Sequence, residues 1–455
     1  MSTLFSARFT PFLEQKPICV MARSVVENLL DPQRIDALFE RTAQRQYTRE
    51  LLYSTLVDLL GQVVFGIQPS LHAAYQAQRP SVSDQAVYDK LNHAELAVSA
   101  ELVRDSARQA AAVIEALAAP FPALLPGYTV KILDGNHLAA TEHRLEELRT
   151  TWVAPLPGKI LAVLNPRRML VEEVFLCENG EASERSMLAE VLATVGAGDL
   201  WIADRNFCTF GFLDGIGQRQ AAYVIRQHGS ITGELRGPSK CRGTLATGRV
   251  FEQQLRTCDP KGNVRRFRRI TVELKKPTKD GELVIHLLSN LPPDQASAMQ
   301  IAELYAKRWT IEIVFQELTV TLVCEIKTLG YPKAALLGFC LALVAYHAVS
   351  VVKAALRSVH GAATVAQNLS GYYLSLEIKQ TYAGMMVALP PGHWKIFRGL
   401  AADKMAEALR LVAGHVMLSR YQKHSRGPKK PPPKKTGYKK GGHIATTKLL
   451  AGRSP

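Results

Sequence analysis

The hydrophobic and polar positions separate helical ends of the chain from a middle part with strand patterns. In the N-terminal quarter, apolar residues recur at helical spacing and Ala, Leu, Gln and Arg are frequent. This pattern predicts helices at Pro32–Arg45, at Thr48–Phe65 and from Ser83 towards Leu117, with breaks at Pro and Gly. The stretch Ser81–Leu96 fits the second half of a helix-turn-helix, with Ser83 as N-cap and Gln85, Tyr88, Asp89 and Asn92 exposed. It fits an ordinary helical hairpin equally well. We expect residues 1–125 to form a helical domain.

After Pro126 and Gly127 the pattern becomes that of a sheet covered by helices. Tyr128–Leu133 alternates and is β-branched, and Leu200–Ala203 is short and apolar; Asp134 and Asp204 follow these two strands directly. The other expected elements are strands at Lys159–Leu164, Met169–Cys177 and Ala221–Ile225 and helices at Ser183–Thr194 and Thr209–Arg219. This order predicts a mixed sheet and an α/β fold class. Chemistry in α/β folds is placed at strand ends, although Asp134 before Gly135 is also a common turn signal.

Residues from about 227 to 290 are Gly-rich, basic and strand-forming. Antiparallel strands are expected at Val250–Arg256, Arg266–Leu274 and Leu283–Ser289. Between Lys261 and Lys279 there are eight Lys or Arg and one acid. Such a run is usually a solvated face, and the alternative is a surface that binds phosphates. The candidate phosphate-binding residues are Arg226, Arg265, Arg266 and Arg268.

The stretch Ile301–Thr319 has the pattern of a single amphipathic helix, with Asp294 as a plausible N-cap. Tyr305, Arg308 and Glu312 are three and four residues apart, so they lie on one face of that helix. Trp309 lies next to Arg308. A glutamate on a helix usually faces water, and only the rest of the chain changes that interpretation.

The C-terminal part is mostly helical and ends in a basic tail. Residues 331–420 form the helical C-terminal region, in which Ala334–Val352 is nineteen residues without a formal charge. That length approaches a membrane span, but Tyr346, His347 and Ser350 interrupt it and a buried core helix is favoured. Residues 421–455 hold ten Lys or Arg and no acid, and are rich in Pro and Gly. This composition predicts a disordered tail.

Charge and cysteine content narrow the class of protein. The net charge is +16 and the pI about 9.5. A basic balance of that size favours nucleic acid as partner, with a membrane surface as the other candidate. The seven cysteines are an odd number without a CxxC pair, which favours a reducing, cytoplasmic compartment over a disulfide framework or a zinc site. The N-terminus lacks the pattern of a signal peptide.

Three carboxylates are the candidate catalytic and metal-binding residues: Asp134, Asp204 and Glu312. Carboxylates that converge on one point repel each other unless a cation lies between them, and oxygen ligands suit Mg²⁺ or Mn²⁺. Two such ions activate an oxygen nucleophile and stabilise the leaving oxygen in phosphodiester transfer. A basic chain with this site is typical of an enzyme that cuts polynucleotides.

The segments LDGNHL, IADRNF and YAKRWTIEIVF resemble the three catalytic blocks of bacterial insertion-sequence transposases with a DDE site on a ribonuclease-H-like fold. The subgroup is the "insertion sequence four" family, whose signature is Tyr, two residues, Arg, three residues, Glu, six residues, Lys. Tyr305, Arg308 and Glu312 match this register, whereas Thr319 stands where the family has Lys. Glu317 does not fit it. The resemblance covers residues 130–339.

The resemblance implies roles for these residues. Asp134, Asp204 and Glu312 would hold the metals, Arg308 would contact a phosphate of the transposon end, and Tyr305 would position that end. It also implies a catalytic core at 126–330 with the basic insertion at 227–290, DNA ends and target DNA as partners, and a homo-oligomeric complex. Residues 1–125 would then help to bind DNA. The basic tail would either help to hold DNA or RNA nonspecifically or serve only as a solubilising extension. The alternatives are a nuclease of the same fold, a catalytically silent DNA-binding derivative and, most distant, a membrane protein.

Overall fold

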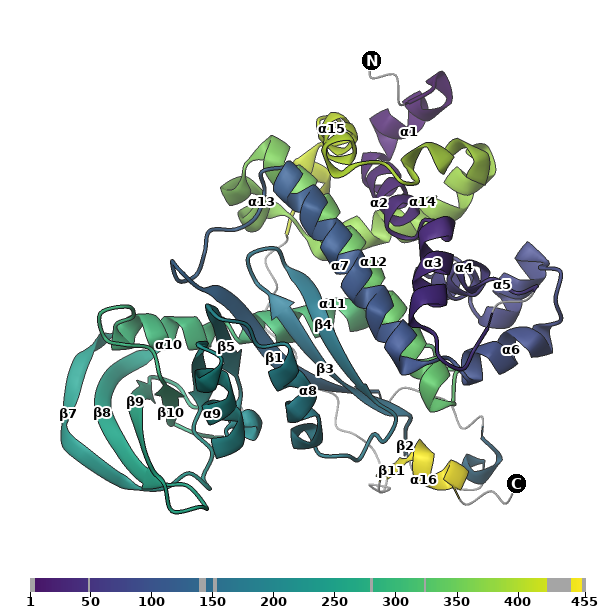
Figure 1. Ribbon diagram of the computed structural model, residues 1–455. Helices are drawn as coiled ribbons and strands as arrows, with labels where there is room; N and C mark the ends of the chain where they lie inside the picture. The colour runs from purple at the N-terminus through teal and green to yellow at the C-terminus, as the bar shows by residue number, and fades with distance from the viewer. Residues whose placement is uncertain are drawn as a thin grey trace, which may run out of the picture.

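A nine-stranded mixed sheet forms the centre of the protein (Figure 1). The computed structural model describes residues 5–47, 50–138, 145–149, 154–278, 281–322, 325–423 and 443–451. The strand order is β4-β3-β1-β5-β6-β10-β9-β8-β7. β1, β5 and β6 are parallel, and the other neighbours pair antiparallel. The strand bounds are β1 Thr129–Leu138, β3 Gly158–Asn165, β4 Leu170–Cys177, β5 Asp199–Ala203, β6 Ala222–Arg226, β7 Glu234–Thr244, β8 Gly248–Cys258, β9 Val264–Leu274 and β10 Val284–Ser289. The α/β class is therefore confirmed.

The basic insertion continues the central sheet, and does so through β10, which pairs antiparallel with β6. β8, β9 and β10 correspond to the three strands expected there. β7 is an additional strand in a stretch for which no strand was expected, since its Gly and Pro are unfavourable in a strand interior. It is the edge strand and almost fully exposed, and an edge strand tolerates Pro238.

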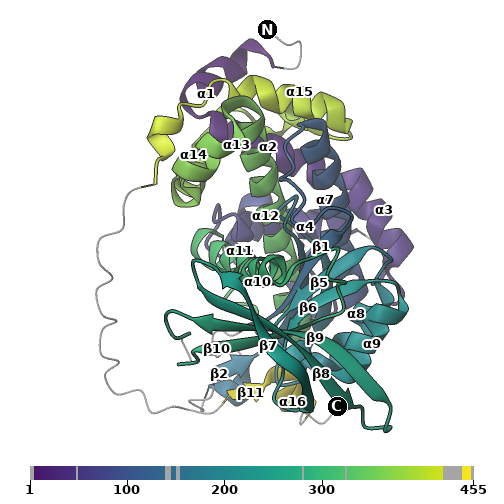
Figure 2. The same cartoon turned by 90° about the vertical axis from the view of Figure 1, so that its left-hand side faces the viewer.

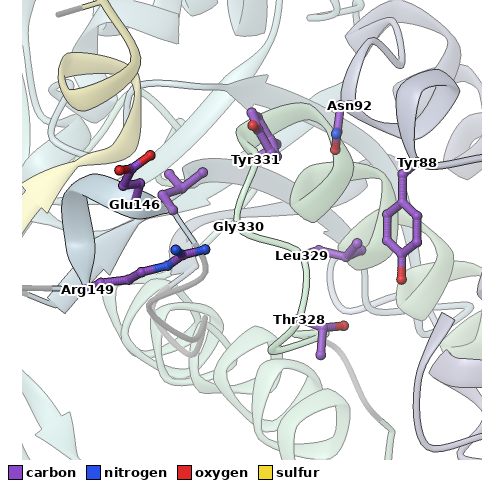
Figure 3. Close-up of a pocket in the computed structure, with 9 residues that line it drawn as sticks. Tyr88, Asn92, Glu146, Arg149, Thr328, Leu329, Gly330 and Tyr331 are labelled. Carbon is purple, nitrogen blue, oxygen red and sulfur yellow. The ribbon is translucent and has the colours of Figure 1, made fainter. Parts of the chain in front are cut away.

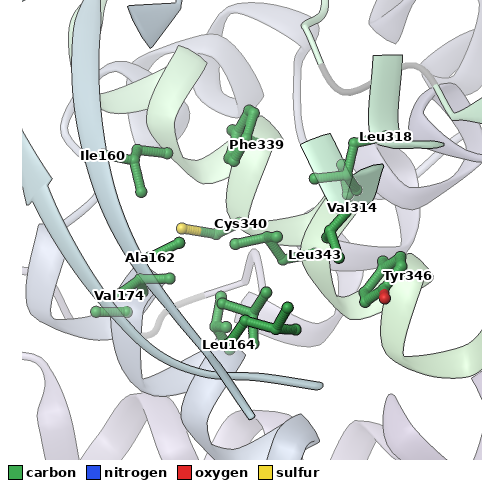
Figure 4. Close-up of a cluster of buried hydrophobic side chains, with 14 of the residues drawn as sticks. Ile160, Ala162, Leu164, Val174, Val314, Leu318, Phe339, Cys340, Leu343 and Tyr346 are labelled. Carbon is green, nitrogen blue, oxygen red and sulfur yellow. The ribbon is translucent and has the colours of Figure 1, made fainter. Parts of the chain in front are cut away.

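Helices cover both faces of the sheet. The long helices α7 (Leu96–Ala116) and α12 (Pro332–His360) pack on each other and on β4, while α8 (Leu188–Ala193) and α9 (Phe210–Gln218) cover the opposite face (Figure 1). Figure 4 shows Cys340 and Leu343 of α12 facing Ile160 and Ala162 of β3. α12 is long and apolar enough to span a membrane, but 89% of its most apolar window is buried inside the protein. Its expected role as a core helix is confirmed.

The first two N-terminal helices share a hydrophobic core with the C-terminal helices, whereas the next four pack into the core of the sheet. The N-terminal helices are α1 Thr10–Gln15, α2 Pro17–Leu29, α3 Pro32–Thr42, α4 Tyr53–Val64, α5 Leu71–Gln78 and α6 Asp84–Asn92; the C-terminal ones are α13 Ala362–Asn368, α14 Gly371–Ala388 and α15 Ala402–Ala413. α2 packs against α12, α14 and α15. The N-terminal helix α2 therefore lies beside α14 and α15 from the C-terminal region (Figure 1). Ser83 caps α6 as expected, accepting from the backbone N–H of Ala86 at 3.2 Å.

The expectation of a disordered tail is wrong for residues 443–451. They form a short strand, β11 (His443–Ala445), and a helix, α16 (Thr446–Ala451). β11 pairs parallel with β2 (Ala154–Leu156), and Lys448 forms an ion pair with Glu181. This docking depends on a partner distant in sequence, so composition alone does not predict it. Residues 424–442, which hold most of the basic charge of the tail, lie outside the described residues.

Candidate active site

Asp134 and Asp204 occupy equivalent positions on two parallel strands. Leu133 of β1 pairs with Ala203 of β5, so the aspartates that follow them lie side by side. Asp134 does not begin a turn, as Asp-Gly suggested, because β1 continues to Leu138 and Asp134 pairs with Ala162 of β3. Alternation along the strand places its side chain on the same face as the core residue Ile132. Asp204 caps a 3₁₀ turn, accepting from the N–H of Asn206 at 2.8 Å.

Tyr305 and Glu312 lie on two consecutive helices, with Arg308 in the turn between them, rather than on the single helix expected. α10 (Ala298–Ala306) begins at a capping box of Ser297 and Gln300, not at Asp294, and α11 (Trp309–Thr321) follows after a tight turn. In this turn the N–H of Arg308 donates to the carbonyl of Tyr305. The sequence has neither Gly nor Pro here, so it carries no local signal for the break. α11 contacts β1 and places Glu312 in its first turn, near the aspartates.

The Arg308 guanidinium bridges two of the three acids. Its Nη1 donates to Asp134 Oδ2 at 2.9 Å and its Nη2 to Glu312 Oε1 at 2.6 Å. The side chains of Arg308 and Asp134 are 12% and 16% exposed. Arg308 therefore neutralises carboxylates in this structure. This contact differs from the phosphate contact that the resemblance implied.

Burial and crowded charge perturb the ionisable groups of the site. The pKa of Asp134 is raised to about 7, chiefly by burial and also by the neighbouring Asp204 and Glu312, against the lowering effect of Arg308 and of the N–H of Gly135. Burial likewise raises the pKa of the Tyr305 phenol, which Arg308 and Arg226 lower. These mutual effects show that the three acids, Tyr305 and the two arginines share one neighbourhood.

The carboxylate oxygens of the site suit a hard divalent cation, and the Arg308 guanidinium lies between two of these carboxylates. Among the described residues, no three Asp, Glu, His or Cys are arranged closely enough to hold a metal ion. Asp134 and Glu312 nevertheless converge on a single cationic group, Arg308. Their oxygens are the ligands preferred by Mg²⁺ and Mn²⁺. The residues therefore fit a metal by chemistry, provided that Arg308 gives up its contacts.

Glu184 is a fourth acid of this neighbourhood, which the sequence pattern indicated only as the start of a helix. Its Oε2 accepts from the side chain of Asn206, and its Oε1 lies against Gly135, where a Cβ would overlap it. Gly135 thus leaves room for the Glu184 carboxylate, and a Cβ here would push the end of that flexible side chain aside. The sequence points to these contacts only through the two residues that Glu184 touches. Gly135 directly follows Asp134, and Asn206 is two residues after Asp204.

Of the four arginines expected to bind phosphates, three form ion pairs with acidic residues of the protein and one is exposed. Arg268 is 11% exposed, pairs with Glu252 at 2.5 Å and donates to the carbonyls of Leu291 and Ala296, so it holds the loop before α10 on the sheet. Arg265 pairs with Asp214 at 2.7 Å and Asp259 at 3.0 Å. Arg226 pairs with Glu282. Arg266 is exposed, and no acidic partner of it occurs in the described part of the chain.

A basic groove of about 670 Å³ runs between β7–β9 and the loop before α10. Lys240 and Arg266 line it, and both are exposed. Arg266 and Arg268 alternate with Phe267, so they point to the face of the sheet on which Ile270 joins the core. α10 contacts β7, β8 and β9 on this side (Figure 2). The groove therefore opens on the same sheet face as Asp134.

A smaller cavity of about 270 Å³ lies between α6 and the segment after α11. Tyr88 and Asn92, two of the residues expected to be exposed on a recognition helix, line it together with Arg149 and Tyr331 (Figure 3). This face of α6 is thus partly occupied by the rest of the chain. Gln85 and Asp89 remain exposed.

The remaining residues of the third block are also placed. Trp309 is 46% exposed and lies under the Arg308 guanidinium, whose Cζ is 5.2 Å from the ring centroid. Glu317 pairs with Lys353 of α12 at 2.7 Å, which accounts for it without a catalytic role. The side chain of Thr319 lies outside the described part of the chain.

A known protein family matches the segment of the chain that contains this site. Residues 125–322 match the family model described as Transposase DDE domain. This match supports a DDE transposase. It runs from the start of β1 to the end of α11 and includes all three candidate acids of the transposase site. No curated protein matches the chain.

Among solved structures, the chain is similar to a piggyBac transposase in a synaptic complex with hairpin DNA. The identity is 8%, the similarity covers 83% of each chain, and the TM-score is 0.37. A likeness this distant carries no argument about the chain described here.

Proposed function

We propose that this protein is a DNA transposase of the insertion-sequence-four type with a ribonuclease-H-like core. It cuts transposon ends by phosphodiester hydrolysis and joins the freed 3′-hydroxyl to target DNA. The observation that carries the proposal is the pairing of Leu133 with Ala203, which places Asp134 beside Asp204 within the segment that matches the transposase family. The link from Asp134 through Arg308 to Glu312 completes the acidic set.

The proposed chemistry assigns a role to each group. Asp134, Asp204 and Glu312 would hold Mg²⁺ or Mn²⁺, which activates the attacking oxygen and stabilises the leaving one. Once its contacts with the acids are released, Arg308 can donate both Nη groups to a phosphate, because guanidinium pairs with phosphate and carboxylate in the same forked geometry. Tyr305 lies beside this position, and burial raises the pKa of its phenol.

The groove with Lys240 and Arg266 supports DNA as the partner. It opens on the sheet face of the acids, so a duplex held there extends from the site across the insertion strands. Phosphate neutralisation by such residues contributes affinity without reading sequence. We further propose that the protein acts in the cytoplasm, on the bacterial nucleoid, as a homo-oligomer on its DNA ends, and that residues 1–125 and the tail contribute to DNA binding.

The test uses DNA that carries both flanks of the gene, labelled at the 3′ ends, with Mg²⁺. Asp134→Asn, Asp204→Asn and Glu312→Gln are each expected to abolish cleavage and to retain DNA binding, because each removes charge from the acidic set and leaves the basic groove intact. Glu317→Gln is the matched control on the same helix and is expected to cleave normally. Full cleavage by any of the three acid variants contradicts the proposal.

A nuclease of the same fold is the second candidate, and product analysis separates it from a transposase. A transposase joins the labelled 3′ end to a second DNA molecule, whereas a nuclease only releases it. A silent DNA-binding derivative would bind the same DNA and produce neither product.

A further inference from the structure

Two arginines beside the acidic site share one carboxylate. Arg205 Nη1 pairs with Glu282 Oε1 at 3.0 Å, and Arg226 Nη2 pairs with Glu282 Oε2. The two guanidiniums thus bind the two oxygens of one anionic group. The three side chains carry a net charge of +1, from two cations and one acid. Arg205 is 48% exposed and Glu282 31%, so solvent reaches the pair from outside.

The strand register places these arginines next to the catalytic acids. Arg205 follows Asp204 directly in the chain. Ala203 of β5 pairs with Ile225 of β6, so Arg226 lies in the same row across the sheet as Asp204 and Asp134. Arg226 is also close enough to the buried Tyr305 to lower the pKa of its phenol. The pair of arginines therefore borders the site on the side of the basic insertion.

Glu282 belongs to the connection between β9 and β10, whereas the arginines belong to the core. A local turn holds it: its N–H donates to Thr278 Oγ1 at 3.2 Å, and the Thr278 N–H donates to its carbonyl at 2.9 Å. Apart from this turn, its side chain contacts only the two arginines among the described hydrogen bonds and ion pairs. Displacing the carboxylate consequently disturbs no strand of the sheet.

We infer that Arg205 and Arg226 form a binding site for one phosphodiester group of the DNA strand that enters the acidic site, and that Glu282 occupies this site when no DNA is bound. A phosphodiester presents two anionic oxygens to two guanidiniums, as the carboxylate does here. The inference rests on the proposed function and adds a binding site and a competing group to it. Glu282 lowers the affinity for DNA because it must leave before the phosphate can bind.

The test measures binding of fluorescent duplex DNA of mixed sequence by full-length protein in EDTA, so that no cleavage occurs. Glu282→Gln is expected to bind about tenfold more tightly, since two partly exposed ion pairs no longer compete with the phosphate. Arg205→Gln and Arg226→Gln are expected to weaken binding, and to reduce the slope of log affinity against log salt by at most about 0.9, since the two arginines share one phosphate.

Glu273→Gln is the matched control. It removes the same charge from the same insertion and frees Arg249 from a comparable pair of 2.7 Å. It is expected to change the affinity for DNA less than about twofold, because the loss of one exposed negative charge adds only a screened, nonspecific attraction between protein and DNA. The double variant Glu282→Gln with Arg226→Gln is expected to lose the gain, since the gain requires both arginines.

The outcomes are decisive for the site and separable from the outcomes for the transposase. Equal affinity of Glu282→Gln and Glu273→Gln overturns the inference, as does weaker DNA binding with a lowered melting temperature, which marks a structural ion pair. If the wild type cleaves and joins DNA while Glu282→Gln shows no gain, the site alone fails. If Glu282→Gln shows the gain while no cleavage occurs under Mg²⁺, the phosphate site stands and the catalytic proposal fails.

Discussion

Replacement of Arg308 by Gln tests the central electrostatic feature of the site. The substitution removes the only cation seen to contact Asp134 and Glu312 in the described part of the chain. Asp134 is 16% exposed and lies beside Asp204, so it becomes a buried carboxylate without a cationic partner and keeps only the hydrogen bond from the Gly135 N–H. We therefore expect Arg308→Gln to lower the free energy of unfolding in the absence of divalent metal.

The magnitude follows from the exposure of the two partners. Breaking a buried ion pair costs about 3–5 kcal/mol, whereas an exposed pair contributes about 0–1 kcal/mol. Asp134 is near the buried limit, and Glu312, which is 35% exposed, lies nearer the exposed one. Removing Arg308 also removes its buried Nε, which has no hydrogen-bond partner in this structure. The expected net loss is about 2–4 kcal/mol.

Urea unfolding followed by tryptophan fluorescence measures this loss, because Trp201 of β5, in the core on the opposite face of the sheet from Asp134, is fully buried and becomes exposed on unfolding. The control is Arg236→Gln, which breaks an exposed pair with Glu234 and is expected to cost less than about 1 kcal/mol. Repeating the experiment with Mg²⁺ adds a second measurement. At ten times its Kd a bound ion stabilises by about 1.4 kcal/mol, and the gain should be larger for Arg308→Gln because the guanidinium no longer competes.

Two results would refute this reasoning. One is an Arg308→Gln variant as stable as Arg236→Gln, which would show that the bridge contributes nothing. The other is an equal Mg²⁺ effect on the wild type and on Arg308→Gln, which would show that guanidinium and metal do not compete for the same oxygens.

Two further predictions concern single residues. Burial lowers the pKa of His347 to about 3. Between pH 6.5 and 3 the unfolded chain therefore binds one proton more than the folded chain, and the free energy of unfolding falls as pH falls, by up to about 1.4 kcal/mol per pH unit. His347→Asn should flatten this pH dependence in urea unfolding, and an unchanged slope would exclude His347 as its source. Gly135→Ala is expected to cost about 0.5–1.5 kcal/mol, since its Cβ would displace the Glu184 carboxylate from its hydrogen bond with Asn206, and to lower cleavage. Normal stability and cleavage would contradict the close approach.

The sequence by itself determined most of the secondary-structure elements and the candidate acidic residues of this protein. Alternating β-branched residues indicated β1, and the apolar run indicated β5, because these patterns match a two-residue period and a buried strand. The helical ends, the core role of α12 and the acids Asp134, Asp204 and Glu312 were also accessible, since each depends on local composition or spacing.

Only the tertiary structure decided how these elements and residues meet. Strand register placed Asp134, Asp204 and Arg226 in one row, and a turn without Gly or Pro placed Arg308 between two acids. Glu184 and Glu282 joined the site from segments with no signal of their own. The same reason explains β7 and the docked residues 443–451, which gain their hydrogen bonds from distant strands. Such contacts depend on which distant segments pair in the fold, and the local pattern of hydrophobic and polar residues does not contain this information.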